Sequence, residues 1–576
     1  MSRKTTMRAL AVVAVVGLGM TAACTDSSSD NKGKSGGSSK GSSAPKTLVV
    51  EDAPVPSFTE NFNPFTTASF SSIENANSLV FEPLFQFNTL DASSAPIPWL
   101  AKSFAWSDGN KTLTLKLQDG VKWSDGQAFS SDDVVFTFNL LKQDGAANTG
   151  GTPIPDSINA SDASTVVLKY KDPQAANFIG IGNQLIVPKH IWSSISKPSA
   201  AVIKSDQAIG TGPYLVDKFS AQNITYKVNP SYRQGEPSVK AISFPAYATN
   251  DTALLAITSG KIDLTGNNIA NVQNAFVAKD PAHNHLFMKD KPYFPSGNTV
   301  TLTLNLKSSS APALADKAVR QAISAGLNRA QYATQCETDY ELPAISSGGL
   351  LLPADQKSLD PKLANDLKPT ADADKVTSIL TGAGYKKNGS GKWEKDGKTI
   401  KFTIIDPNSF TDYWCAAGAM AKDLNAVGMD VSTNGQFDFN SWNTAITSGK
   451  YDAAIHWGQG GTPFQRLQYL IDPALTAPVG QTAAENFSRY DNPAAAAAIK
   501  AYQNSTDEAS GTAALKTLQN LLSTDAPAIP VLYGAAWYEY NDTKFTGWPN
   551  SDDPYINPGP NSQAYEYMIL KLKPRS

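Results

Sequence analysis

The sequence predicts an α/β protein built from two or three domains. The chain has 576 residues, which is more than one hydrophobic core usually holds. Residues 113–117 alternate between apolar and polar side chains, as a half-buried strand does. Residues 124–126, Ser-Asp-Gly, then supply turn chemistry, and Ser130 or Ser131 can cap a following helix. Residues 132–133 are both Asp and would lie in the first helical turn, where acids suit the dipole.

Further strands and helices follow from the same kind of pattern. Residues 47–50 and 215–219 read as short strands, and the glycines of 210–214 permit a tight backbone ahead of the second. Residues 316–323 predict a helix in which an Asp and an Arg four positions apart could form an ion pair. Residues 451–456 predict another strand.

The N-terminal residues indicate where the protein works. Residues 3–8 carry three basic side chains, and the apolar run 9–20 is too short to span a bilayer comfortably. The small residues 21–23 lead into Cys24, which resembles a bacterial lipobox with Cys24 as the lipidated residue. The alternative is an ordinary secretory signal with a chance cysteine. Residues 25–45 are almost all small and polar, and predict a disordered tether with about 25 Å of reach.

Composition excludes several classes of function. The net charge is −3 and no basic block follows the signal, so nucleic acid is not an expected partner. The four histidines include one close pair, His283 and His285, without a cysteine or carboxylate cluster, so no metal site is predicted. Beyond Cys24 only Cys336 and Cys415 remain. In an extracellular protein they predict a disulfide, with two buried free thiols as the alternative.

Several sequence blocks resemble the extracellular solute-binding proteins of family 5, the oligopeptide and dipeptide receptors of bacterial ABC importers. The most specific is V-K-W-S-D-G-Q-A-F-S-S-D-D-V-V-F-T-F over 121–138. Other matching blocks occur in the family's order, at 61–65 (N-F-N-P-F), 79–84, 99–111, 210–214 (G-T-G-P-Y), 229–232, 316–323, 383–385, 424–429, 451–455 and 490–493. Asn328-Arg329 stands where the family usually has Asp-Arg. The resemblance covers nearly all of residues 47–574.

The resemblance implies a two-lobed periplasmic-binding-protein-like fold, a class II Venus flytrap, with an extra subdomain inserted in lobe I. Carried onto this chain, the parts are a signal peptide 1–23, a tether 24–46, lobe I at 47–92, 207–297 and 530–576, the inserted subdomain 93–206, and lobe II at 298–529. Hinges would lie near 295–299 and 527–531. Such a receptor closes around its ligand and delivers it to an ABC permease with its ATPase subunits. We expect a monomer, held on the extracellular face by its lipid and needing no cofactor.

An enzyme is the alternative from a different class. The sequence contains no G-x-S-x-G, H-E-x-x-H, Walker A or post-strand G-x-G-x-x-G motif. The acid pairs at 132–133 and 552–553 fit a helix cap and a solvated loop better than catalysis. A secreted hydrolase would turn over a chromogenic ester or glycoside. A sensory or chaperone-like binder on the same fold would lack a neighbouring permease gene.

The ligand-binding residues are predicted from local chemistry. The main candidate segment is 457–463, at the end of the strand 451–456, where Trp457 could stack, Gln459 could hydrogen-bond, and Gly458 and Gly460 would allow close backbone approach. A plain strand-to-loop turn is the alternative. The other candidates are Thr462 in the same segment, Asp406-Pro407-Asn408 with Tyr413 and Trp414, Asn63 and Phe65 in lobe I, and Asn298 near the hinge.

One departure from the family bears on the ligand. Oligopeptide receptors of the family that this chain resembles typically carry an Asp just after the strand that corresponds to residues 451–456 and Trp457 here. That Asp pairs with the α-ammonium group of the bound peptide. Residues 458–462 contain no acid, and a buried ammonium without a carboxylate is costly. A short oligopeptide remains the first expectation. An oligosaccharide is the alternative, because sugar faces stack on aromatic rings, and nickel is less favoured because histidines are few.

Overall fold

The computed structural model describes residues 46–52, 54–66, 69, 77–91, 94–458, 460–505, 507–560, 562 and 564–576. Four predicted features lie outside these residues: the signal peptide, the lipidation site Cys24, the tether up to residue 45, and Gln459. None of the helices formed by the described residues has the length and apolar character that crossing a membrane requires.

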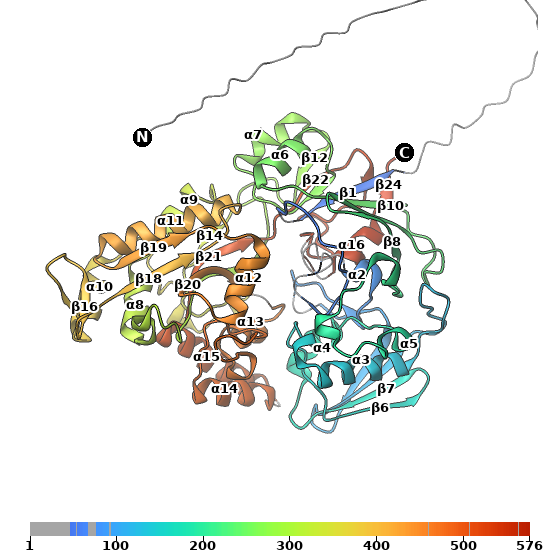
Figure 1. Ribbon diagram of the computed structural model, residues 1–576, viewed down its shortest axis with the longest axis horizontal. Coiled ribbons are helices and arrows are strands. Elements are labelled where there is room, and N and C mark those ends of the chain that lie inside the picture. Colours follow the sequence, from blue (N-terminus) through green and yellow to red (C-terminus); the bar gives the residue numbers. More distant parts are fainter. Residues whose placement is uncertain are drawn as a thin grey trace, which may run out of the picture. The chain divides into compact units, whose positions relative to one another are not determined.

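The first sheet has seven strands in the order β12-β22-β11-β1-β10-β9-β8 (Figure 1). Their bounds are β1 Thr47–Glu51, β8 Tyr214–Ser220, β9 Asn223–Val228, β10 Ala241–Pro245, β11 Leu264–Thr265, β12 Asn284–Leu286 and β22 Glu539–Asn541. β1 runs parallel to both β10 and β11, and the other neighbours are antiparallel. The helices α2 (Asn77–Val80), α6 (Asn250–Thr258), α7 (Val272–Ala275) and α16 (Tyr565–Lys571) contribute to the same hydrophobic core.

The second sheet has six strands in the order β14-β21-β13-β20-β18-β19. Their bounds are β13 Ser296–Leu304, β14 Leu342–Pro343, β18 Lys401–Ile405, β19 Asp430–Asn434, β20 Ala453–Gly458 and β21 Ala528–Ala535. β18 runs parallel to both β19 and β20, whereas β13 is antiparallel to β20 and β21. Helices α8 (Lys317–Ala325), α9 (Arg329–Gln335), α10 (Ala373–Gly382) and α11 (Thr411–Ala426) share its main core, and Trp442 of α12 (Phe439–Ser448) lies in a smaller core beside β20.

The predicted ion pair at the start of α8 is wrong. Asp316 caps the helix by accepting from the Ala318 amide at 2.9 Å. Arg320 is buried and donates instead to main-chain carbonyl oxygens of Leu314 and Asp525. Helix ends leave carbonyls without intrahelical partners, and a guanidinium satisfies several of them at once.

The third sheet is formed by residues 101–169 and carries the sequence block that first indicated the family. It has the order β4-β5-β7-β6, with bounds β4 Ala101–Ser107, β5 Thr112–Leu117, β6 Ser157–Asp162 and β7 Thr165–Lys169. Helix α3 (Ser131–Gln143) packs against β6 and β7 (Figure 1). Ser130 is its N-cap and forms a capping box with Asp133, which confirms the predicted cap. Trp123 is 0% exposed against Phe129 and belongs to the core of this sheet.

The chain passes between the first two sheets twice. β12 of the first sheet precedes β13 of the second, and β21 of the second precedes β22 of the first. The second change of sheet therefore follows Ala535, whereas the predicted hinge at 527–531 lies around the start of β21. The limits of the lobes and of the inserted subdomain stay predictions.

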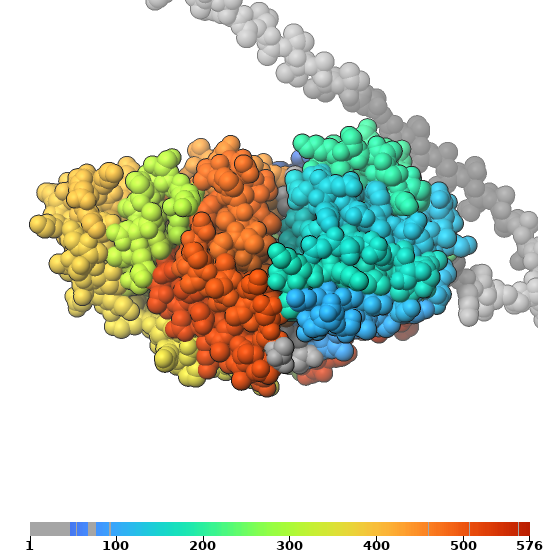
Figure 2. Space-filling view, turned by 90° about the horizontal axis from the view of Figure 1, so that it is seen from below, coloured from blue at the N-terminus to red at the C-terminus, as the bar shows by residue number. Residues whose placement is uncertain are grey.

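Three helices extend from the second sheet and meet the inserted segment. They are α13 (Pro463–Ile471), α14 (Pro493–Gln503) and α15 (Glu508–Asp525), and they form a separate apolar cluster. Lys500 of α14 lies 3.4 Å from the carboxylate of Asp172. Figure 2 shows this contact region, with the orange surface of the helices beside the cyan surface of the inserted segment. Segments more than 300 residues apart are thus in direct contact.

Candidate functional site

Polar groups gather where the parallel strands of both large sheets end. In open α/β sheets, ligands bind outside the carboxyl ends of the strands. In the first sheet β1 ends at Glu51 and β11 ends at Thr265, one residue before Asn267 and Asn268. In the second sheet β18 ends just before Asp406, and the neighbouring β20 ends at Trp457 and Gly458. Strand topology therefore directs attention to these two edges.

Trp457 lies in a wall of aromatic rings. Its ring stacks at 5.2 Å from that of Trp442 in α12 and at 6.3 Å from that of Tyr413 in α11. Phe410 is 6.4 Å away, and the His456 ring stacks on both Trp457, at 5.1 Å, and Trp442, at 5.5 Å. Trp457 remains half-buried while Trp442 is fully buried. The wall is therefore braced from behind, with part of Trp457 left accessible.

A small cavity of about 20 Å³ lies against this wall. It is lined by Thr303, His456, Trp457, Gly458, Tyr469, Leu470, Glu485, Phe487 and Ser488. A cavity of this size holds about one water molecule, so it is too small for a peptide or an oligosaccharide. Burial lowers the pKa of His456 to about 4 and raises the pKa of Glu485. His456 is neutral at pH 7, and its Nδ1 donates to the Trp457 carbonyl at 2.8 Å. The surroundings of Trp457 therefore carry no fixed positive charge.

Four buried carboxyl groups form a cluster on the other side of Tyr413; we call Glu337, Glu341, Asp406 and Asp412 the junction acids. All four are at most 8% exposed. Oε1 of Glu341 accepts from the Tyr413 hydroxyl at 3.1 Å and from the Ala535 amide at 3.0 Å.

Burial raises the pKa of every junction acid, and the charge of Asp412 raises the pKa of the other three further. The pKa of Asp412 rises to about 6, and those of Asp406, Glu337 and Glu341 also rise strongly. No salt bridge between described residues involves any of the four, and none of the described acidic, histidine or cysteine side chains form a group suited to a metal ion. The junction acids thus lack a positive partner among the described residues.

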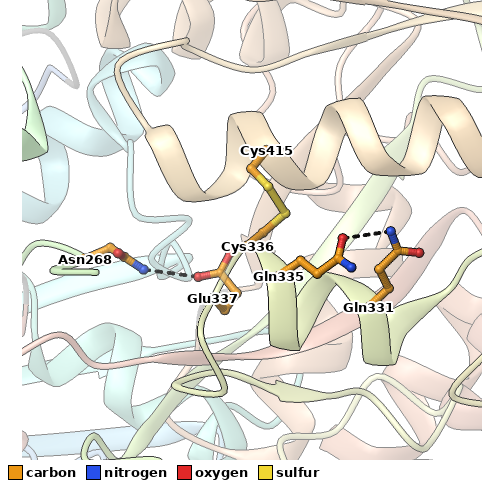
Figure 3. Close-up of a disulfide and its surroundings, with 6 residues drawn as sticks. All are labelled: Asn268, Gln331, Gln335, Cys336, Glu337 and Cys415. Atoms are coloured by element: carbon orange, nitrogen blue, oxygen red, sulfur yellow. Dashed lines mark hydrogen bonds between the residues drawn. A yellow bond between two sulfur atoms is a disulfide. The ribbon is translucent and has the colours of Figure 1, made fainter. Parts of the chain in front are cut away.

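The junction acids also contact the first sheet (Figure 3). Asn268, just beyond β11, donates to Oε2 of Glu337 at 3.3 Å. Its neighbour Asn267 donates to the carboxylate of Glu51, which also accepts from Thr265 at 2.6 Å. Glu539, at the start of β22, is 0% exposed, and its two carboxylate oxygens have no hydrogen-bond partner among the described residues. Consecutive asparagines therefore donate to Glu51 of the first sheet and to Glu337, which follows α9.

The predicted disulfide lies beside this contact. Cys336, which follows α9, is bonded to Cys415 of α11, with Cα atoms 5.6 Å apart (Figure 3). Glu337 is the next residue after Cys336 and Asp412 lies one helical turn before Cys415. The bridge therefore ties together the two segments that supply three of the junction acids.

The lobe I candidates are placed in the protein interior. Asn63 is 0% exposed, and its amide donates to the carbonyls of Pro198 and Ala201 at 2.7 and 2.8 Å. Phe65 is 2% exposed and packs edge-on against Trp192 at 5.1 Å. These contacts brace the loop 61–65, and ligand contact by either residue stays a prediction.

The remaining candidates divide between the aromatic wall and its surroundings. Gly458 lines the small cavity with Trp457. Thr462 caps α13 by accepting from the Gln465 amide, and Gly460 adopts φ of 112° against the main chain of that helix. Asn408 is exposed and Trp414 half-buried, and both approach Gly435 rather than Trp457. Asn298 lies in β13, with a buried Oδ1 that finds no partner in the described part of the chain.

Sequence reasoning missed Glu337, Glu341 and Asp412. A pattern of acids at 337, 339 and 341, directly after a cysteine, was the only local signal. Asp406 was noted as a candidate, and Asp412 is only six residues from it, but Glu337 and Glu341 lie 69 and 65 residues before it and could not be linked to it by any local pattern.

Comparison with known proteins identifies the family. Residues 95–472 match the family described as bacterial extracellular solute-binding proteins, family 5 Middle. Protein XP55 of Streptomyces lividans is 26% identical over 462 residues, 78% of each chain. The oligopeptide-binding protein AppA of Bacillus subtilis is 27% identical over 75% of this chain and 76% of its own.

A solved structure gives the same result for the fold. The mannohexaose-bound periplasmic oligopeptide-binding protein of an oligopeptide ABC transporter from Thermotoga maritima superposes with a TM-score of 0.81. It is 25% identical, and the match covers 92% of this chain and 99% of that one. The predicted α/β fold of the two-lobed periplasmic-binding-protein type is confirmed. Because the family match covers more than half of the sequence, the chain belongs to the bacterial extracellular solute-binding proteins of family 5.

Proposed function

We propose that this protein is the substrate receptor of an ABC importer and captures a short oligopeptide between its two lobes. The supporting observation is that both large sheets bring polar groups to the carboxyl ends of parallel strands, and that these groups meet through Asn268 and Glu337. A ligand there would touch both lobes and stabilise the closed form, which a permease can recognise. The relative AppA is named an oligopeptide-binding protein, which supports a peptide as the ligand.

The remaining parts of the proposal concern location and assembly. Cys24 carries the lipid anchor on the extracellular face, residues 25–45 form the tether, and the receptor works as a monomer with a permease and its ATPase subunits. Lobe I comprises 47–92, 207–297 and 530–576, lobe II 298–529, and the inserted subdomain 93–206. The protein binds and delivers its solute without chemistry or cofactor.

An oligosaccharide is the second candidate, because of the aromatic wall. Stacked indole and phenol rings beside a cavity without fixed positive charge suit a sugar face. The similar Thermotoga protein was crystallised with mannohexaose. Thermal unfolding of the purified protein with tri- to pentapeptides, and with β-linked and mannose oligosaccharides, separates the two. A ligand at 100 times its Kd adds about 2.7 kcal/mol to the stability. A shift with sugars alone would refute the peptide proposal.

Trp457 is the residue to test under either candidate. Trp457→Ala removes the accessible face of the wall, and we expect affinity to fall at least about tenfold, since stacked aromatic contacts in a binding site carry more than 1 kcal/mol. Trp106→Ala is the matched control, because Trp106 is also half-buried but lies in β4 of the third sheet. Equal affinities of Trp457→Ala and wild-type protein, measured by calorimetry, would remove Trp457 from the site.

A further inference from the structure

Tyr340 lies where the two connections between the large sheets meet. Its ring centroid is 5.6 Å from that of Tyr293 and 5.9 Å from that of Phe294, both in the segment that leads from β12 to β13. It is also 6.3 Å from the ring of Trp537, in the segment that leads from β21 to β22. Tyr340 is 4% exposed and packs in the hydrophobic core of the first sheet. One aromatic side chain therefore contacts both crossings of the chain.

The loop that carries this side chain is nevertheless fixed to the second sheet at both ends. Residues 337–341, which we call the Cys336 loop, follow α9 and precede β14. At its start, Cys336 is bonded to Cys415 of α11 (Figure 3). At its end, Glu341 accepts from the Tyr413 hydroxyl of α11 at 3.1 Å, and β14 pairs with β21. Because α11 shares the core of the second sheet, the loop belongs mechanically to that lobe.

The middle of the Cys336 loop contacts the opposite lobe. The Tyr340 hydroxyl accepts from the amide of Val272, the first residue of α7, at 2.9 Å. Nζ of Lys291, which follows β12, donates to the Thr338 carbonyl at 2.8 Å. These two bonds add to the one that Asn268 makes with the same loop. A loop held by one lobe is thus docked in the other.

The backbone around this contact is strained at four places. Thr338 and Asp339 have φ of 51° and 63°, Tyr293 has 64°, and Asn271 at the start of α7 has 54°. The left-handed region is unfavourable for residues with a Cβ, most of all for a β-branched residue such as Thr. Four of the eleven non-glycine residues with positive φ in the described chain meet here, so strain is concentrated at this contact. Such strain persists where surrounding contacts fix the backbone, and it gathers at switch regions.

The lobes touch at a second place, between α14 and the inserted segment. There Lys500 is 3.4 Å from Asp172, so the described conformation is closed at this edge. A rotation that separates these two side chains also changes how Tyr340 meets Val272, because the Cys336 loop is fixed to one lobe and α7 to the other.

We propose that Tyr340 is a positioning residue for solute capture, which fixes the angle at which the lobes close by docking the Cys336 loop between the two connections. The bridge from Cys336 to Cys415 transmits this docking to α11, whose Tyr413 stacks on Trp457 of the aromatic wall. The inference rests on the proposed capture of a solute between the lobes. It does not depend on whether that solute is a peptide or a sugar.

Cross-linking measures closure without a ligand. In the full chain, Asp172→Cys and Lys500→Cys together place two thiols at facing positions, and a short bismaleimide joins them only while the lobes are closed. Chains with one of the two substitutions give the background. Adding Tyr340→Phe to the pair leaves the Val272 amide unpartnered in the closed form. We expect cross-linking to slow about fivefold, the factor that one hydrogen bond commonly contributes. Where the lobes are mostly closed without ligand, the same shift gives a larger radius of gyration in solution scattering.

Tyr214→Phe is the matched control. The Tyr214 hydroxyl is buried and also bonds to the main chain, donating to the Val239 carbonyl at 3.0 Å, but both residues lie in the core of the first sheet. This substitution should leave cross-linking and the radius of gyration unchanged. Equal results for Tyr340→Phe and Tyr214→Phe in both measurements would overturn the inference.

A double-mutant comparison tests the part played by the disulfide. Cys336→Ala with Cys415→Ala should also slow cross-linking, and Tyr340→Phe should then add little, because both changes act through the same loop. Fully additive effects would overturn the assignment of the bridge to this device. No ligand takes part in these measurements, so their failure would leave the proposed receptor function to its own test by thermal unfolding.

Discussion

Asp412→Asn should change how the stability of the protein depends on pH. The side chain of Asp412 is buried at the start of α11, and burial raises its pKa from an ordinary 3.8 to about 6. Asp412 in the unfolded chain releases its proton near pH 4, whereas in the folded protein it keeps the proton to about pH 6. The folded state binds more protons in this window, so the free energy of unfolding falls as the pH rises through it.

The size of the effect follows from the shift. A gap of about two pH units, at about 1.4 kcal/mol per unit, gives about 3 kcal/mol. Asparagine has the same shape and no proton to lose. The stability of Asp412→Asn relative to wild type should therefore rise by about 3 kcal/mol between pH 4 and pH 7. The pKa of the neighbouring Glu341 rises to about 8, which is above this window.

Urea unfolding measured by tryptophan fluorescence at several values between pH 4 and pH 7 provides the assay. Asp430→Asn, on an exposed edge of the same sheet, is the control and should show a difference from wild type that does not change with pH. A constant difference for Asp412→Asn as well would show that its carboxyl is solvated in solution. The reasoning about all four junction acids would then fail, since it depends on the same burial.

Two further predictions concern stability alone. Replacing Cys336 and Cys415 by Ala opens a covalent loop spanning 79 positions, and should lower the free energy of unfolding by about 4.5 kcal/mol in the chain-entropy model; an unchanged urea midpoint after reduction of the wild type would contradict this. Gly210→Ala would place a Cβ 1.8 Å from the Val80 carbonyl oxygen and should destabilise by about 2 kcal/mol or more. Gly145→Ala, which meets nothing within 4 Å, is its control in thermal unfolding, and equal melting temperatures would disprove the predicted clash.

The local elements could be predicted because their causes are local. The cap at Ser130 needs only the side chains of one helical turn, and the strand at 113–117 needs only alternation. The strand predicted at 451–456 begins and ends two residues later, as β20 at 453–458, because its pairing with β13 sets the limits. The family resemblance supplied the two-lobed fold, which no single pattern in the chain contains.

The candidate site could be predicted only in part, because its members meet through long-range packing. Trp457 was accessible to sequence reasoning as an aromatic residue at a strand end followed by glycines. Glu337 lies 69 positions after its partner Asn268, and Glu341 lies 72 positions before its partner Tyr413. Neither spacing corresponds to a helix or strand period, so no pattern could link them. Asn63 was predicted as a ligand contact because of its loop, but its amide is occupied by main-chain carbonyls of a segment 135 residues away.

The distribution of buried charge explains why the junction acids are informative. Buried polar groups in a folded protein normally have hydrogen-bond or charge partners. Sites where such partners are missing are expected to be functional. Arg233 forms an ion pair with Glu82, and Arg466 forms one with Asp355; neither pair includes a junction acid. Where Asn268 meets Glu337, several buried carboxyls share a site without a base among the described residues, and Glu51 and Glu539 form a second such group. Lobe II alone gains nothing from that arrangement, because Asp412 raises the pKa of Asp406, Glu337 and Glu341.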